Sequence, residues 1–109
     1  MKLWIDDCRP APPGYVWLKS TNEALRFIVA HYNDIEEISL DHDAGEYVRD
    51  GGDYIEILDE LERLSYSSRW SYVPKHLCEK SKFHLHTANP VGAANMRRII
   101  QRNGWREVK

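Results

Sequence analysis

Four aspartates stand directly after short apolar segments of this chain. Asp6 and Asp7 follow the first such segment, and Asp41 and Asp43 follow a later one. If the two segments are neighbouring parallel strands, their carboxyl ends bring these side chains to one edge of a sheet, where open α/β sheets bind ligands. Like charges repel there, which a cation or a chemical task normally offsets. Asp6, Asp7 and Asp41 therefore predict a divalent metal site, with Mg²⁺ or Mn²⁺ favoured by hard oxygen ligands and Zn²⁺ as the alternative.

Two histidines end a third apolar segment. His84 and His86 are two residues apart, so in a strand their imidazoles share one face of the sheet. Such a pair can ligate a metal, hold a phosphoryl oxygen or act as general acid and base, whereas two core histidines bonded to backbone are the alternative. We predict that His84 and His86 are catalytic and that Asp43 orients a neighbour or adds a ligand. His42 is either a supporting partner or faces away.

Three further residues at the same edge could bind phosphate. Arg9 follows the acidic pair and could grip phosphate in a bidentate manner or neutralise the carboxylates. Thr87 ends the histidine segment with a hydroxyl donor. Asn89 precedes Pro90, a pattern typical of a helix N-terminus, whose free N–H groups favour an anion. We predict Arg9, Thr87 and Asn89 as substrate-binding residues.

The elements that must position these side chains alternate along the chain. Strands are expected at residues 3–5, 15–18, 37–41, 82–87 and 105–108, with amphipathic helices between 20 and 32, between 54 and 64, and from 90 to 102. This alternation predicts an α/β fold of three layers, in which helices cover both faces of a mostly parallel sheet of about five strands.

Residues 65–82 are the least regular part of the pattern, and we expect an irregular insertion or lid there. Trp70 and Tyr72 in this segment could stack on a base. The other large aromatic residues are expected in the core, namely Trp4, Trp17, Tyr54 and Trp105.

Length and composition bound the classes of function. The chain has 109 residues, enough for a single domain spanning 1–109, and a formal charge of −2. That charge argues against broad binding to duplex DNA, and no apolar run is long enough to span a membrane. The start of the chain does not resemble a signal peptide, so we expect a cytoplasmic protein in which Cys8 and Cys78 are reduced thiols.

At this point a family resemblance emerges. The double aspartate after the first strand, the aspartate after the third and Thr87-Ala88 after the fourth resemble a response-regulator receiver domain. The closer resemblance is to the cyclic-phosphate-processing receiver domains. It rests on three segments: LWIDDCRP at 3–10, ISLDHD at 38–43 and HLHTANPVG at 84–92.

That resemblance implies a flavodoxin-like sheet and a metal site at Asp6, Asp7 and Asp41. It also implies that the histidines process phosphoesters, with 2′,3′-cyclic RNA ends or nucleotides as substrates. The leading hypothesis is therefore a metal-dependent phosphoesterase. The alternative is a non-catalytic module that binds a phosphorylated ligand or a protein partner through the same edge.

Two departures separate this chain from ordinary receivers. Residues 9–14 form a proline-rich loop where receivers have a helix, and the only lysine comparable to the one ending their fifth strand is Lys109. Phosphorylation of Asp41 in a phosphorelay is therefore the least favoured hypothesis.

Overall fold

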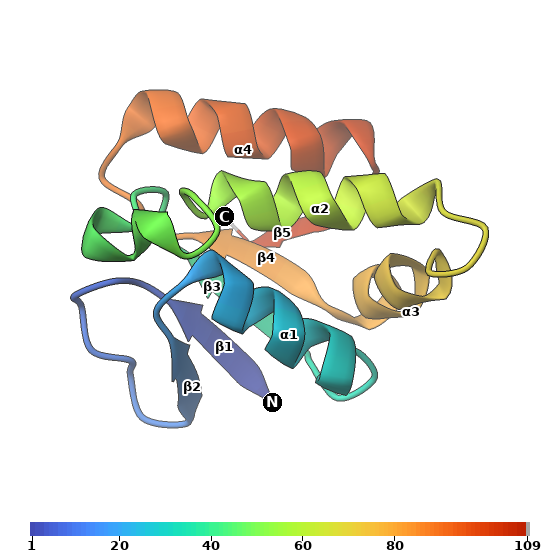
Figure 1. The fold of residues 1–109 in the computed structure, drawn as a ribbon, viewed down its shortest axis with the longest axis horizontal. Helices are drawn as coiled ribbons and strands as arrows, with labels where there is room; N and C mark the ends of the chain where they lie inside the picture. The colour runs from blue at the N-terminus through green and yellow to red at the C-terminus, as the bar shows by residue number, and fades with distance from the viewer. Residues whose placement is uncertain (109) are drawn as a thin grey trace.

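The protein is described here by a computed structural model that covers residues 1–108. Lys109, named above as the only lysine comparable to the receiver lysine, lies outside the described residues. Five strands form one parallel sheet in the order β2-β1-β3-β4-β5 (Figure 1). The strands are β1 Lys2–Ile5, β2 Tyr15–Leu18, β3 Glu37–Leu40, β4 Lys82–Leu85 and β5 Arg106–Val108. The helices are α1 Thr21–His31, the short 3₁₀ helix η1 Gly45–Arg49, α2 Ile55–Ser65, α3 Tyr72–Lys80 and α4 Pro90–Arg102.

Side-chain caps start two of the helices where the sequence predicts them. The Ser20 hydroxyl accepts a hydrogen bond from the backbone N–H of Glu23 at 3.0 Å, and the Glu23 carboxylate accepts one from the N–H of Lys19 at 2.9 Å. The Asn89 side chain accepts one from the N–H of Gly92 at 2.9 Å, with Pro90 in the first turn of α4. These contacts satisfy N–H groups that have no partner inside a helix.

The four α-helices of residues 1–108 pack on the same face of the sheet. Helix α2 contacts α1, α3 and α4, and Figure 1 shows these helices together in front of the strands. A single core joins the inner faces of the helices to one face of the sheet. Its fully buried strand residues are Leu3, Ile5, Ile38, Leu40 and Phe83.

The α/β class and the five-stranded, parallel, receiver-like sheet are confirmed, but the helices differ from the expected cover on both faces. The crossovers from β2 to β3, from β3 to β4 and from β4 to β5 all advance in one direction across the sheet. Because such crossovers are right-handed, their helices lie on one face. The connection from β1 to β2 runs the opposite way and would place a helix on the other face, but it is the proline-rich loop.

The second face of the sheet therefore carries side chains that no α-helix among residues 1–108 covers. Trp4 is in register with Trp17 on one side and with Ser39 on the other, and Ser39 is in register with His84. Since side chains alternate along strands, these four residues form one row across this open face. Trp4 and Trp17 are half-buried there, so the expectation that both lie in the core is wrong, whereas Tyr54 is fully buried in the core.

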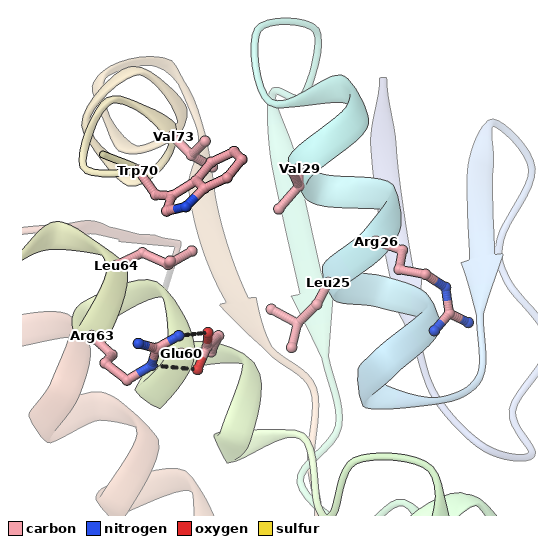
Figure 2. A pocket seen from close by; sticks show the side chains of 8 residues that line it. All are labelled: Leu25, Arg26, Val29, Glu60, Arg63, Leu64, Trp70 and Val73. Carbon is pink, nitrogen blue, oxygen red and sulfur yellow. Dashed lines mark hydrogen bonds and ion pairs between the residues drawn. The ribbon is translucent and has the colours of Figure 1, made fainter. Parts of the chain in front are cut away.

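Residues 65–82, expected to be an irregular insertion or lid, contain helix α3 from Tyr72 to Lys80, which packs on α2 at the far end of the helical layer. Together with α1 and α2 it lines a groove of about 470 Å³. Figure 2 shows Trp70 and Val73 on one side of this groove, opposite Leu25 and Val29 of α1. The groove lies on the helical face, so Trp70 is on the opposite side of the sheet from His84.

Within residues 1–108, no helix is both long enough and apolar enough to cross a bilayer. Cys8 and Cys78 are free thiols.

Candidate active site

Asp6 is the buried centre of the open face. It directly follows β1, its side chain is fully buried, and its two carboxylate oxygens accept four hydrogen bonds. Oδ1 accepts from the backbone N–H groups of Cys8 and Arg9 at 3.0 and 2.9 Å. Oδ2 accepts from Nε of Arg9 at 3.0 Å and from Nε2 of His86 at 2.9 Å. Burial opposes ionisation, but these donors outweigh it and hold the pKa of Asp6 below its usual value.

Ser39 joins the two histidines of the fourth strand. Its Oγ lies 2.7 Å from Nδ1 of His86 and 3.0 Å from Nδ1 of His84. Ser39 is fully buried in β3, whereas both histidines are partly exposed. The result is a continuous hydrogen-bonded chain from Asp6 through His86 and Ser39 to His84.

The direction of each hydrogen bond in this chain follows from the ionised carboxylate. Burial lowers the pKa of His86 more than the hydrogen bond to Asp6 raises it, so His86 is neutral at pH 7. Because Asp6 only accepts, His86 carries its proton on Nε2, and its Nδ1 accepts from the Ser39 hydroxyl. The Ser39 oxygen must then accept from Nδ1–H of His84, so in the neutral form of His84 the lone pair is on Nε2.

His84 is the histidine that can meet a ligand. Its Nε2 has no hydrogen-bond partner within residues 1–108, and His84 lines a hollow of about 390 Å³ together with Leu85, Val108 and the Arg97–Glu107 ion pair. His86 is held more tightly, because its ring stacks on Trp4 with centroids 3.7 Å apart and an angle of 3° between the planes. The side chain of His86 is only 7% exposed.

Arg9 bridges the carboxylates of two strands. Its Nε bonds to Asp6, and its Nη2 lies 3.1 Å from Oδ2 of Asp41, the residue after β3. Partial burial opposes its charge, but the two carboxylates raise the pKa of Arg9 further, so it stays protonated. The side chain is 48% exposed, and Nη1 has no partner among residues 1–108. These free N–H groups can bind a phosphate oxygen.

The first group of residues that could hold a metal consists of Asp6, Asp7 and Cys8, whose ligand atoms lie within 4.8 Å of one another. Receiver domains bind divalent cations through acidic side chains, and the carboxylates of Asp6 and Asp7 fit that chemistry. A cation would have to displace one of the four donors from Asp6. Partial desolvation and the nearby charges of Asp7 and Asp6 raise the pKa of the Cys8 thiol, which makes it the weaker ligand.

Asp41 is not part of this group, and its Oδ2 instead lies 3.1 Å from Nη2 of Arg9. Its role as a third metal ligand stays a prediction. The identity of the ion, Mg²⁺, Mn²⁺ or Zn²⁺, is likewise a prediction.

Asp43 belongs to a different cluster. Its Oδ1 lies 2.8 Å from Nδ1 of His42, and these two residues form a second candidate metal group with Asp53. Asp43 is 63% exposed and makes no hydrogen bond to His84 or His86 within residues 1–108. A catalytic role for Asp43 therefore stays a prediction without a contact to support it.

Thr87 and Asn89 lie at the same sheet edge and engage each other. The Thr87 hydroxyl oxygen accepts a hydrogen bond from the N–H of Asn89 at 3.1 Å, so its proton remains free to donate to an anion. The side-chain carbonyl of Asn89 accepts a hydrogen bond from the N–H of Gly92. Their role in binding phosphate stays a prediction.

Comparison with known proteins agrees with this geometry. The sequence profile of the cyclic-phosphate processing receiver domain matches residues 1–102. Neither the curated proteins nor the solved structures give a significant match. With its parallel receiver-like sheet and with aspartates and histidines gathered at the carboxyl ends of β1, β3 and β4, this chain belongs to the family of cyclic-phosphate processing receiver domains.

Proposed function

We propose that this protein is a phosphoesterase that opens cyclic phosphates, such as 2′,3′-cyclic nucleotides or RNA ends, by hydrolysis on the open face of its sheet. The observation that carries the proposal is the free Nε2 of His84, whose lone pair is set by the chain through Ser39 and His86 to Asp6. A neutral imidazole with an exposed lone pair is the form that a general base requires.

In the proposed reaction, Nε2 of His84 takes a proton from the attacking water. A new P–O bond forms, one P–O bond to the ribose breaks, and the ribose oxygen receives the proton. After taking the proton from water and before giving it to the ribose oxygen, His84 is positively charged. This charge is stabilised by proton shifts along the hydrogen-bonded chain, because Ser39 can pass a proton from Nδ1 of His84 to Nδ1 of His86. His86 would then be an imidazolium beside the ionised Asp6.

Arg9 would bind the phosphate and offset the charge that develops on it. The two carboxylates fix its guanidinium, so its free N–H groups are oriented before the substrate arrives. Thr87 adds a hydroxyl donor at the same edge. A divalent cation, when bound by Asp6 and Asp7, would supply further positive charge to a phosphoryl oxygen.

The test is hydrolysis of a nucleoside 2′,3′-cyclic phosphate, followed by ³¹P NMR, with Mg²⁺, Mn²⁺, Zn²⁺ or a chelator. His84→Gln should lower kcat by about 10²-fold or more, the usual contribution of a general base. The matched control is His76→Gln, which removes a half-exposed histidine from α3. Full activity of His84→Gln would refute the mechanism.

Binding without turnover is the second candidate, and the openness of the site favours it. Helix α3 packs on α2 and lies on the other face of the sheet, so no segment among residues 1–108 closes over His84. Calorimetry separates the two functions: binding of a cyclic nucleotide with no product under any metal would support the non-catalytic module.

A further inference from the structure

Three aromatic side chains on the open face lead away from the histidines, and we call them the aromatic strip: Trp4, Trp17 and Tyr15. Trp4 stacks on His86 and meets the edge of Tyr15 with centroids 5.9 Å apart. Trp17 is in register with Trp4 on the neighbouring strand β2. All three are half-buried, and none belongs to the buried core residues. The strip is therefore continuous with the site around His84.

The polar atoms of these rings are already bonded to the protein. The indole N–H of Trp4 donates to the carbonyl of Arg9 at 2.9 Å, and that of Trp17 donates to the carbonyl of Asp6 at 2.8 Å. The Tyr15 hydroxyl donates to Glu37. These bonds fix the orientation of the rings, so what the strip offers to a ligand is π surface.

Cations stand over this π surface. Nζ of Lys19 lies 4.4 Å from the centroid of Trp17, and Nζ of Lys2 lies 5.7 Å from that of Tyr15. Neither ammonium group has a carboxylate partner within residues 1–108. In a chain with a net charge of −2, half-buried aromatic rings beside cations that have no carboxylate partner within residues 1–108 suit a ligand that is flat and anionic.

We propose that the aromatic strip binds the nucleobase attached to the ribose whose cyclic phosphate is held near His84. The base stacks on Trp17 in place of the Lys19 ammonium group, and Lys19 and Lys2 then meet phosphate groups beside it. This inference rests on the proposed function, and it makes a base-bearing ester, a free nucleotide or an RNA end, the substrate in preference to a cyclic phosphate of a sugar without a base.

The experiment compares three esters with the same reacting group: ribose 2′,3′-cyclic phosphate without a base, cytidine 2′,3′-cyclic phosphate, and a trinucleotide ending in that phosphate. We expect a KM roughly tenfold lower for the better of the two base-bearing esters, because stacking of one base on an aromatic ring gives a gain of this order. Trp17→Leu should remove this difference. The matched control is Trp70→Leu, which removes an exposed tryptophan on the helical face and should preserve it.

The outcomes separate this inference from the proposed function. Equal KM values for all three esters in the wild-type protein would overturn the base-binding role while hydrolysis itself stands.

If none of the three esters is hydrolysed, the proposed function fails. Quenching of tryptophan fluorescence by the trinucleotide would then still support base binding by the aromatic strip, provided that Lys19→Glu abolishes the quenching. If the trinucleotide does not quench the tryptophan fluorescence, the base-binding role of the aromatic strip is overturned. A dimer in sedimentation experiments that Trp17→Leu dissociates would also overturn it, because a second copy would then cover the face. Lys19→Glu changes only a side chain with no hydrogen bond, so it remains informative if Trp17→Leu does not fold.

Discussion

Nε2 of His86 lies 2.9 Å from Oδ2 of Asp6, although the two residues are 80 positions apart in the sequence. Their strands are separated by β3, yet both side chains reach past its end, because each residue directly follows its strand on the open face. Arg9 contacts the same oxygen of Asp6. Asp6 thus contacts both Arg9, whose guanidinium would bind phosphate, and His86, which belongs to the hydrogen-bonded chain that would move the proton.

Asp6→Asn should damage both stability and activity. An amide offers one acceptor oxygen where the carboxylate has two, so some of its four donors would face an N–H₂ group. We expect a loss of about 3 kcal/mol in the free energy of unfolding, as for a broken buried ion pair. We expect kcat to fall by about 10³-fold, because the carboxylate no longer fixes the tautomer of His86.

The control for this change is Asp50→Asn. Asp50 also accepts side-chain hydrogen bonds, from Ser20 and Asn22, but it lies on the exposed surface. Chemical denaturation and steady-state kinetics measure both effects. Wild-type kcat in Asp6→Asn would remove Asp6 from the mechanism.

Ser39→Ala tests the bridge between the histidines. The substitution removes one oxygen and leaves Nδ1 of His84 and Nδ1 of His86 without their shared partner. We expect kcat to fall by roughly 10- to 100-fold with KM nearly unchanged, because a positioning hydrogen bond contributes less than the base itself. The acidic limb of the pH–rate profile should shift, which a purely structural role would not cause.

Ser81→Ala is the matched control for the bridge. Ser81 is also fully buried, and its hydroxyl donates to the carbonyl of Ile35 at the opposite end of the sheet. We expect it to lose about 1 kcal/mol of stability without a change in the pH–rate profile. Identical profiles for Ser39→Ala and the wild-type protein would contradict proton transfer through Ser39.

The folded state should lose stability as pH falls through the range in which histidine titrates. Burial holds the pKa of His86 in the folded protein below 6.5, so the unfolded chain binds the proton first. The free energy of unfolding is therefore highest above about pH 6.5 and decreases below it. Asp6 does not contribute in this range, because its lowered pKa moves its effect below pH 3.8.

Urea denaturation at pH 7.5 and pH 5.0 measures this dependence. His86→Gln should reduce the difference in the free energy of unfolding between the two pH values. His76→Gln, at a half-exposed position on α3, should retain the wild-type difference. If His86→Gln shows the wild-type difference, groups other than His86 cause the pH dependence of stability.

The convergence of Asp6, Asp41 and His86 could be predicted because parallel strands end at a common edge. Every strand order in which β1, β3 and β4 are adjacent brings these residues together, so the prediction required that adjacency but not the complete topology. Ser39 was missed because a serine within a strand carries no chemical signature. The available signal was its spacing, since Ser39 is two residues before Asp41 and must share its face.

The one-sided helical layer required the strand order, which the sequence does not reveal. The proline-rich loop after β1 removes one crossover helix, but only the order β2-β1-β3-β4-β5 shows that this helix would have covered the second face. The absence of a helix on this face among residues 1–108 also explains why Trp4 and Trp17 are only half-buried. Large aromatic residues usually indicate a core, but Trp4 is two residues before Asp6 and shares its face.

A divalent cation should bind more weakly after Asp7→Asn. Asp7 contributes one of the two carboxylates in the acidic group, and its Oδ2 lies against Gly45, where a Cβ atom would approach to 2.3 Å. We expect the Kd for Mn²⁺, measured by calorimetry, to rise about tenfold or more. Loss of binding in Asp41→Asn as well as in Asp7→Asn would support the ligand set expected from the sequence, with Arg9 displaced from Asp41. Unchanged binding in Asp7→Asn would remove Asp7 from the site.

Gly92→Ala should destabilise the protein by a close contact at the start of α4. A Cβ atom at Gly92 would lie 2.5 Å from Cγ of His42, whose Nδ1 bonds to Asp43. The start of the helix is held because Asn89 caps this turn through the N–H of Gly92, and the ring of His42 is held by its contact with Asp43. We expect a loss of about 1–3 kcal/mol, the usual range for overpacking.

The double variant with His42→Ala makes this prediction specific. Removing the imidazole provides the space that the new methyl group needs, so the double variant should lose less stability than the sum of the two single changes. Thermal denaturation of the four proteins gives the coupling energy. Additive losses would show that the contact between α4 and the segment after β3 is looser than this geometry requires.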